Sequence, residues 1–293
     1  MKKIKYLFEA LLLSLLVLIF KLMPAEMASQ IGAKLALRFG VKSGASRTAK
    51  ANIDAAFPEM DNNAREQILV DMWDNLGRVV GEYAHLPVLC ESYCEIENIE
   101  ILEDIAEKQS PALFIGMHQA NWEVAAMQLR RFPGLNVGAV YRAPNNPYAD
   151  SILQALRDYK KGEPSFAKST RGMRTMIAHL KNNGQIGLLI DQKYNEGSET
   201  LFFNRPAMTS TAYIELARKF DCPIIPVQME RIESCFFKMT VHPPLELNLN
   251  APDEALAETH KMLEEWIRAK PAEWLWVHKR WKDSKKAPQK DAS

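Results

Sequence analysis

A histidine and a glutamate five residues apart are the side chains of this sequence best suited to chemistry. They are His118 and Glu123, within the stretch Pro111–Arg131. The run Ala112–Met117 before them is short and apolar, which predicts a buried strand, and the segment after them has the apolar spacing of a helix. We therefore expect the imidazole on a strand-to-helix loop and the carboxylate in the first turn of the helix. Loops at the carboxyl ends of strands are where open α/β sheets bind their ligands.

This pair is typical of general-base catalysis. A histidine that takes a proton from an acceptor hydroxyl, beside a carboxylate that fixes its tautomer and stabilises its positive charge, is the base half of a catalytic triad. No serine or cysteine stands beside His118 in the sequence to act as a nucleophile. The pair therefore favours direct transfer to a substrate hydroxyl, without a covalent enzyme intermediate. The spacing alone fits equally well a histidine at the end of a strand and a glutamate that caps a helix.

Other polar residues follow the next predicted strands. Arg142 ends the second and Asp191 ends the third, while Lys168, Arg171 and Arg174 stand before or early in a helix. The N-terminus of that helix could bind an anion, arginine binds phosphate bidentately, and lysine acts as a compact point charge. We expect these side chains to form a phosphate-binding rim beside the imidazole. Each cation taken alone is more often a solvated surface charge, and Asp191 fits a simple cap or turn as well as a substrate contact.

The elements that must position these residues alternate along the chain. Five short apolar runs are predicted to be strands: Ala112–Met117, Asn136–Tyr141, Gln185–Asp191, Pro223–Arg231 and Phe236–His242. Asn146 is expected to cap one of the helices between them, and residues 26–82 read as helical, with Asp61 as an N-cap. The alternation predicts an α/β fold with a mostly parallel central sheet flanked by helices, preceded by an N-terminal hydrophobic membrane helix.

The composition gives no support for a nucleic-acid partner, a disulfide framework or a metal site. The 293 residues are 47% hydrophobic, which supports a substantial core, and carry Lys+Arg 37 against Asp+Glu 36. This near balance gives no indication of a nucleic-acid partner. Of the four cysteines only Cys90 and Cys94 are close in the sequence, so neither a disulfide framework nor a metal site is expected.

The N-terminus is expected to associate with a membrane. The segment Leu7–Met23 is hydrophobic, but its uninterrupted apolar part, Ala10–Phe20, is short for a helix that spans a bilayer. No clear cleavage site for a signal peptide follows it, so we favour a retained anchor or an interfacial helix. Positive charges are more numerous after this segment than before it, which favours a catalytic domain on the cytoplasmic face of the membrane.

We accordingly divide the chain into an anchor helix (1–25), a catalytic domain (26–282) and a disordered tail (283–293). The stretch Trp274–Lys282 mixes three tryptophans with four cations. Aromatic and basic residues together favour an anionic membrane interface. The same stretch is also compatible with a C-terminal helix that packs through its tryptophans and leaves its cations in solvent.

Taken in order, these motifs resemble those of the lipid A late acyltransferases, the lauroyl/myristoyl transferases of the lysophospholipid acyltransferase superfamily. The resemblance covers nearly the whole chain. It rests on the N-terminal hydrophobic helix and on these segments: Asn52-Ile53, Ala56–Glu59, His118–Glu123, Tyr141-Arg142, Arg171-Gly172, Asp191-Gln192, Phe202-Phe203 and Trp274–Lys282. Lys193 and Asn204 depart from the family pattern, and both are expected near the mouth of the site.

The resemblance implies acyl transfer from an acyl carrier protein thioester to a hydroxyl of a lipid A precursor, at the inner face of the inner membrane. It makes His118 the general base and Glu123 its orienting partner. Arg142 and Arg171 become candidates for binding the phosphates of donor or acceptor, and Asp191 a structural or substrate contact. No metal or organic cofactor is implied, because the thioester is already activated.

Three alternatives remain open from the sequence. A related acyltransferase could use another lipid acceptor, such as a glycerophospholipid, an aminolipid or a glycolipid of the phosphatidylinositol mannoside type. A membrane-tethered lipid-binding protein could carry the His/Glu pair for structural reasons alone. A hydrolase would need a nucleophile or a metal near His118, and neither is apparent in the sequence.

Overall fold

The computed structural model describes residues 2–141, 143–157, 164–167 and 170–281. The predicted tail and two of the predicted phosphate-binding residues, Arg142 and Lys168, lie outside the described residues.

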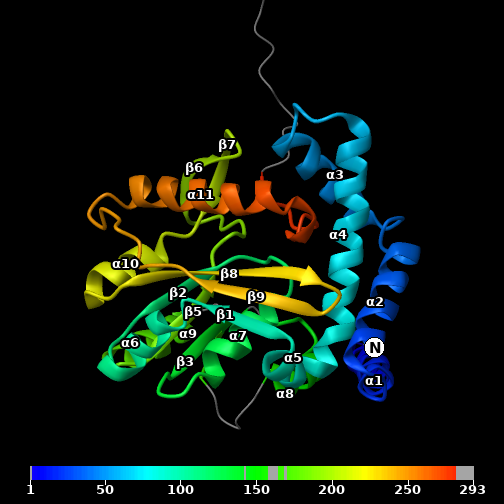
Figure 1. Ribbon diagram of the computed structural model, residues 1–293, viewed down its shortest axis with the longest axis horizontal. Coiled ribbons are helices and arrows are strands. Elements are labelled where there is room, and N and C mark those ends of the chain that lie inside the picture. The colour runs from blue at the N-terminus through cyan, green and yellow to red at the C-terminus, as the bar shows by residue number, and fades with distance from the viewer. Residues whose placement is uncertain (1, 142, 158–163, 168–169, 282–293) are drawn as a thin grey trace, which may run out of the picture.

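A seven-stranded sheet forms the centre of the molecule (Figure 1). Its strands, in spatial order, are β1 (Cys94–Glu97), β9 (Phe236–Val241), β8 (Ile224–Glu233), β2 (Leu113–Gly116), β5 (Gln185–Leu189), β3 (Val137–Tyr141) and β4 (Ser165–Ala167). All neighbouring strands are parallel except β8 and β9. A separate hairpin is formed by β6 (Ser198–Phe202) and β7 (Arg205–Thr209). The predicted α/β fold with a mostly parallel sheet is confirmed.

All five predicted strands are present, each within about two residues of its predicted ends, whereas β1, β4, β6 and β7 were not expected. These four are short, and the burial of β1 and β6 alternates between partly exposed and exposed over most of their length. Strands of this kind lack the continuous apolar run that identifies a buried strand, so hydrophobic pattern alone does not reveal them.

Helices cover both faces of the sheet and one of its ends. They are α1 (Lys2–Lys21), α2 (Ala25–Phe39), α3 (Gly44–Ala56), α4 (Asn62–Glu82), α5 (Leu86–Ser92), α6 (Glu100–Lys108), α7 (Trp122–Arg131), α8 (Pro147–Arg157), α9 (Thr170–Lys181), α10 (Ala212–Phe220) and α11 (Pro252–Ala269), with short 3-10 turns η1 (Tyr83–His85) and η2 (Pro271–Glu273). Figure 1 shows α2, α3 and α4 standing together at one end of the sheet, beside α1. The predicted caps are confirmed: Asp61 accepts from the backbone N–H of Ala64 at 2.9 Å, and Asn146 accepts from that of Tyr148 at 3.0 Å.

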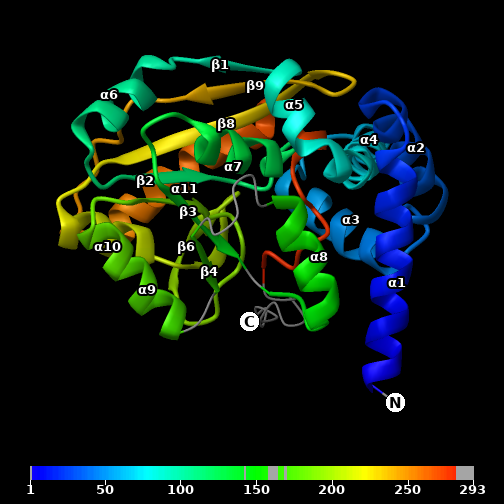
Figure 2. The ribbon, with the colours of Figure 1, turned by 90° about the horizontal axis from the view of Figure 1, so that it is seen from below.

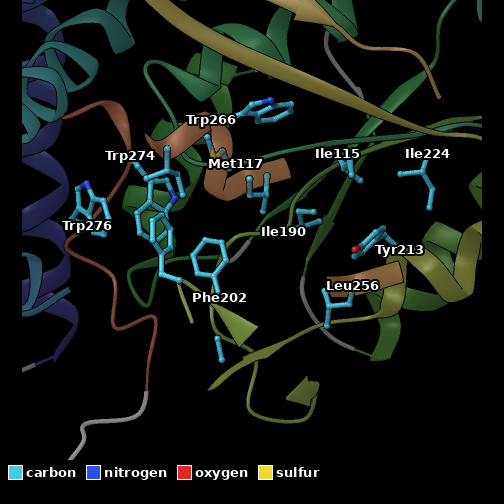
Figure 3. Close-up of a cluster of buried hydrophobic side chains, with 14 of the residues drawn as sticks. Ile115, Met117, Ile190, Phe202, Tyr213, Ile224, Leu256, Trp266, Trp274 and Trp276 are labelled. Carbon is cyan, nitrogen blue, oxygen red and sulfur yellow. The ribbon is translucent and has the colours of Figure 1, made fainter. Parts of the chain in front are cut away.

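Two hydrophobic clusters lie on opposite faces of the sheet. Successive residues of β2 alternate between them: Leu113 and Ile115 join the cluster beneath α9, α10 and α11, and Phe114 joins the cluster beneath α5, α6 and α7. Figure 3 shows part of the first cluster, with Trp274 beside Trp276 and Phe202. Burial on both faces explains why β2 reads as a continuous apolar run in the sequence.

The C-terminal tryptophans belong to this first cluster and not to the molecular surface. Trp274, Trp276 and Trp281 are 2%, 0% and 6% exposed. The expectation that they meet a membrane is therefore wrong. Packing through the tryptophans is confirmed, but the segment after η2 forms no helix up to Trp281, where the described residues end.

Helix α1 extends away from the body of the protein (Figure 2). It contacts α8 through Asn146, whose amide donates to the backbone oxygen of Tyr6 at 2.9 Å and to Glu9 at 3.0 Å. Most of its large apolar side chains stay exposed, and within α1 only Ala10 and Phe20 are buried. None of the helices in the described part of the chain combines the length and apolar character needed to cross a membrane. A spanning N-terminal helix is thus not supported.

Candidate active site

His118 and Asp191 meet at the carboxyl edge of the sheet. The parallel register pairs Gly116 of β2 with Leu189 of β5. His118 and Asp191 each lie two residues beyond that pair, so the two side chains leave neighbouring strands at the same level. This position is the edge at which open α/β sheets bind ligands.

Asp191 holds the histidine through two hydrogen bonds. Nδ1 of His118 lies 2.8 Å from Oδ1 of Asp191, and the backbone N–H of His118 donates to Oδ2 at 3.1 Å. The indole N–H of Trp274 also donates to Oδ2, at 2.8 Å. The carboxylate side chain is only 3% exposed, whereas that of His118 is 16% exposed. The acid is therefore a buried support, and the imidazole is the member of the pair that solvent reaches.

The electrostatics of this pair favour an ionised carboxylate. Burial alone acts to raise the pKa of Asp191, but His118 and the hydrogen bonds from His118 and Trp274 outweigh it and lower that pKa to about 2. An ionised Asp191 accepts the proton of Nδ1, so the hydrogen-bond network assigns the tautomer with the lone pair on Nε2. The side-chain nitrogen of Gln192 lies 3.2 Å from this Nε2 and is placed to donate to it.

The C-terminal segment forms the other side of the histidine loop. Gln119 and Trp274 form an isolated antiparallel bridge, and the backbone N–H of Leu275 donates to the oxygen of His118 at 3.0 Å. Asn52 on α3 fixes this segment in turn, because its amide donates to the backbone oxygens of Trp276 and His278, both at 2.7 Å. Side chains far apart in sequence therefore define the position of His118.

Glu123 does not make the contact that the sequence pattern predicts. Its carboxylate accepts two hydrogen bonds from the Arg157 guanidinium, at 2.6 and 2.8 Å, and one from the Trp122 indole at 3.1 Å. The hydroxyl of Tyr83 donates to it as well. Since Arg157 is a fixed charge that matches a carboxylate bidentately, it takes the acceptor sites of Glu123. The geometry thus gives the contact with Nδ1 to Asp191.

The predicted rim of cations is only partly visible. Arg142 and Lys168 lie outside the described residues, as does the side chain of Arg171, although its backbone belongs to α9. Arg174 is exposed on α9. Arg157 was not singled out in the sequence, where no spacing connects it with Glu123, and only the packing of α8 against the site brings the two together.

No group of three or more His, Cys, Asp or Glu side chains arranged to hold a metal ion occurs among residues 2–141, 143–157, 164–167 and 170–281. A histidine hydrogen-bonded to a buried carboxylate is an arrangement that suits general-base chemistry. Within the described residues, the side chains that hydrogen-bond to the imidazole are those of Asp191 and Gln192, and neither carries a hydroxyl or a thiol.

Comparison with known proteins gives relatives over most of the chain. The lipid A biosynthesis lauroyltransferase of Escherichia coli (strain K12) is 24% identical over 259 residues, covering 85% of this chain and 82% of the relative. The lipid A biosynthesis myristoyltransferase of the same organism is 24% identical over 270 residues, covering 88% and 82%. Its lipid A biosynthesis palmitoleoyltransferase is 22% identical over 245 residues, covering 80% and 78%.

A family model described as bacterial lipid A biosynthesis acyltransferase matches residues 2–283. That range contains the sheet, both partners of the His118–Asp191 pair and the C-terminal segment that supports them. The match agrees with the resemblance already seen in the order of the motifs. The chain therefore belongs to the bacterial lipid A biosynthesis acyltransferases.

Proposed function

We propose that this protein transfers a fatty acyl chain from an acyl carrier protein thioester to a hydroxyl of a lipid A precursor, with His118 as general base and Asp191 as its positioning partner. The observation that carries the proposal is the hydrogen bond of 2.8 Å between Nδ1 of His118 and the buried carboxylate of Asp191. This bond leaves Nε2 as the basic atom, on a side chain that solvent reaches.

The reaction follows from this geometry. The acceptor hydroxyl takes the place of the Gln192 amide at Nε2 and gives its proton to the imidazole as its oxygen attacks the thioester carbonyl carbon. The new C–O bond forms, and the C–S bond then breaks with departure of the thiolate, which takes the proton from Nε2. Asp191 stabilises the transient imidazolium without accepting its proton, because its low pKa keeps it ionised.

Glu123 acts one step further from the reacting atoms. Its ion pair with Arg157 joins the first turn of α7 to the last turn of α8, while Trp122 packs edge-on against the His118 ring, with centroids 5.1 Å apart. The pair thereby fixes the helical side of the histidine loop. We propose that Glu123 keeps Trp122 and the loop in place, and that it contributes to turnover through this role.

The donor and acceptor are proposed from the family. The relatives are named for lauroyl, myristoyl and palmitoleoyl transfer, so acyl carrier protein thioesters of such chains are the donors to try first. Arg142, Lys168, Arg171 and Arg174 are proposed to bind donor or acceptor phosphates, because they follow strands or begin a helix at the edge where His118 lies. No organic cofactor enters the proposal.

We further propose that the protein works at the cytoplasmic face of the inner membrane. The support is the row of exposed apolar side chains on α1, among them Leu7, Phe8, Leu11 and Leu15, with Lys2, Lys3 and Lys5 at its start. An apolar face beside cations suits a helix that lies in an anionic interface.

The experiment is an assay of the full-length protein with lauroyl- or myristoyl-acyl carrier protein and a lipid A precursor that bears its inner sugar acids, read by mass spectrometry. We expect the precursor to gain the mass of one acyl chain, and His118→Ala to lower the rate by about a thousandfold or more. If the folded wild-type protein acylates only a glycerophospholipid or a glycolipid in parallel assays, that lipid is the acceptor in place of the lipid A precursor. Equal rates for the wild type and His118→Ala would overturn the mechanism.

A further inference from the structure

A buried ion pair lies behind the loop that carries His118. Glu82, the last residue of α4, is 0% exposed, and Arg231 of β8 binds both of its oxygens, at 2.6 and 3.0 Å. The hydroxyl of Ser29 on α2 donates to the same carboxylate at 2.7 Å. Three elements of the scaffold thus meet at a charge that takes no part in the proposed chemistry.

Each member of this pair is connected to the histidine loop by an asparagine. The amide of Asn121 donates to Oε2 of Glu82 at 2.8 Å, and its side-chain oxygen accepts the backbone N–H of Glu123 at 3.2 Å as the N-cap of α7. On the other side, Nε of Arg231 donates to the oxygen of Asn75 at 2.9 Å, and the Asn75 amide donates to the backbone oxygen of Ala120 at 3.3 Å. The ion pair therefore reaches two consecutive residues between His118 and Glu123.

The loop needs such support because its backbone is strained. Ala120 has a φ of +47°, in the left-handed region that alanine rarely adopts. Its N–H donates to the backbone oxygen of Glu273 at 3.0 Å, and the Glu273 carboxylate accepts the backbone N–H of Arg231 at 3.3 Å. Strained backbone persists only where its surroundings over-determine it, and here both polar backbone groups of Ala120 are held by this one network.

Stability is a weak reason to keep this pair. Two charges taken out of water lose their hydration, and replacement of a buried ion pair by apolar residues of similar size is often neutral or stabilising. The contacts to Asn75 and Asn121, in contrast, cannot be reproduced by apolar side chains. What distinguishes the ion pair from an apolar substitute is the fixed direction of its hydrogen bonds toward the loop.

We propose that Glu82 and Arg231 are positioning residues that hold residues 118–123 in their strained conformation and thereby place His118 and Glu123. The part that concerns turnover rests on the proposed acyl transfer. The part that concerns the conformation of the loop does not, so the two are measured separately.

The test compares three full-length variants. The pair Glu82→Met with Arg231→Met removes both charges together and leaves no buried charge unpaired. Asn121→Ser keeps an N-cap acceptor for α7 but is too short to reach Glu82. Asp71→Asn is the control, because Asp71 is exposed on the same helix and accepts a hydrogen bond from Gln67, outside the contacts of Glu82.

We expect kcat to fall by about 10- to 100-fold in the double variant and in Asn121→Ser, with KM changed by less than about threefold, since a displacement of the base near 1 Å costs rates of that order. The melting temperature of the double variant should stay near that of the wild type, and Asp71→Asn should match the wild type in both measurements. A purely structural role predicts instead that activity and melting temperature change together.

Hydrogen exchange read by mass spectrometry tests the loop without any assay of activity. The peptide containing residues 117–124 should exchange faster in the double variant and in Asn121→Ser, while peptides from β2 and β5 keep their protection. Wild-type kcat together with unchanged exchange of this peptide in either variant overturns the proposal. If the wild type shows no acyl transfer, the proposed function fails, and the exchange result alone decides the role of the ion pair.

Discussion

The end of β5 and the first turn of α7 each bring a carboxylate to the histidine loop, and the two carboxylates have different partners. Asp191 is fixed by the sheet and faces Nδ1 of His118, whereas Glu123 is fixed by α8 and faces Arg157. The difference follows from geometry, because parallel neighbours in register carry their following residues to the same level. The first turn of α7, which follows β2 after the five-residue loop 117–121, carries its carboxylate toward other helices. The acid nearest in sequence is therefore not the acid that faces Nδ1 of His118.

The largest expected effect breaks the contact on the sheet side. Asp191→Asn keeps the size of the side chain but replaces a carboxylate oxygen that accepts from Nδ1 with an amide that can donate to it. This favours the histidine tautomer with its proton on Nε2. We expect kcat to fall by roughly 10³-fold or more, with KM little changed and the fold retained. Steady-state kinetics with circular dichroism as the control for folding checks this. A loss of less than tenfold in a folded protein contradicts the role given to Asp191.

The next effect concerns the helix side. Glu123→Gln and Arg157→Gln should each lower kcat by about 10- to 100-fold, because each loosens the attachment of α7 to α8 near the loop. The double variant should be little worse than either single variant, since both remove one interaction. Fully multiplicative losses in this double-mutant cycle would mean that Glu123 acts on His118 independently of Arg157.

Acid pH sharpens the comparison through stability. The folded-state pKa of Asp191 is lowered from 3.8 to about 2 by His118 and the hydrogen bonds around it, against the raising effect of burial. A carboxyl group with a depressed pKa stabilises the fold above its unfolded pKa, near 4, and this stabilisation is lost as the pH falls toward 2. Urea unfolding midpoints should therefore drop more steeply from pH 4.5 to pH 2.5 in the wild type than in Asp191→Asn. Parallel curves for the two proteins are the contrary result.

The smallest effect on the chemistry is expected on the exposed face of α1, because the described hydrogen-bond partners of Asp191 and Glu123 include no residue of α1. The double substitution Leu11→Glu with Leu15→Glu places two negative charges on the exposed apolar face of α1. Binding to anionic vesicles, measured by sedimentation, should fall by about tenfold or more, because two apolar side chains no longer enter the membrane interface. Turnover of detergent-dispersed substrate should stay within about twofold of the wild type. Ile99→Glu, an exposed apolar position beside α6, serves as the control. Vesicle binding that is unaffected in the double variant excludes α1 as the membrane contact.

Much of the architecture follows from local pattern. Short segments already determine the five main strands, and with them the position of His118 after β2, because strands buried on both faces read as apolar runs. The caps at Asp61 and Asn146 likewise depend on a single local hydrogen bond from each side chain. The family resemblance has the same origin, because motifs in a shared order are visible without a structure. These features depend on neighbours within one or two turns of the chain.

The composition of the site was decided only in three dimensions. Asp191 is 73 residues from His118 and Trp274 is 83 residues from Asp191, and they meet because β5 lies next to β2 and the C-terminal segment crosses that edge. The same packing buries tryptophans whose composition had favoured a membrane interface, and joins Arg157 to Glu123. The spacing of apolar residues indicates which face of a segment is buried, but the order of the strands in the sheet depends on how the connecting segments pack. For this protein, the sequence by itself singled out His118, and the tertiary structure decided which carboxylate faces its Nδ1.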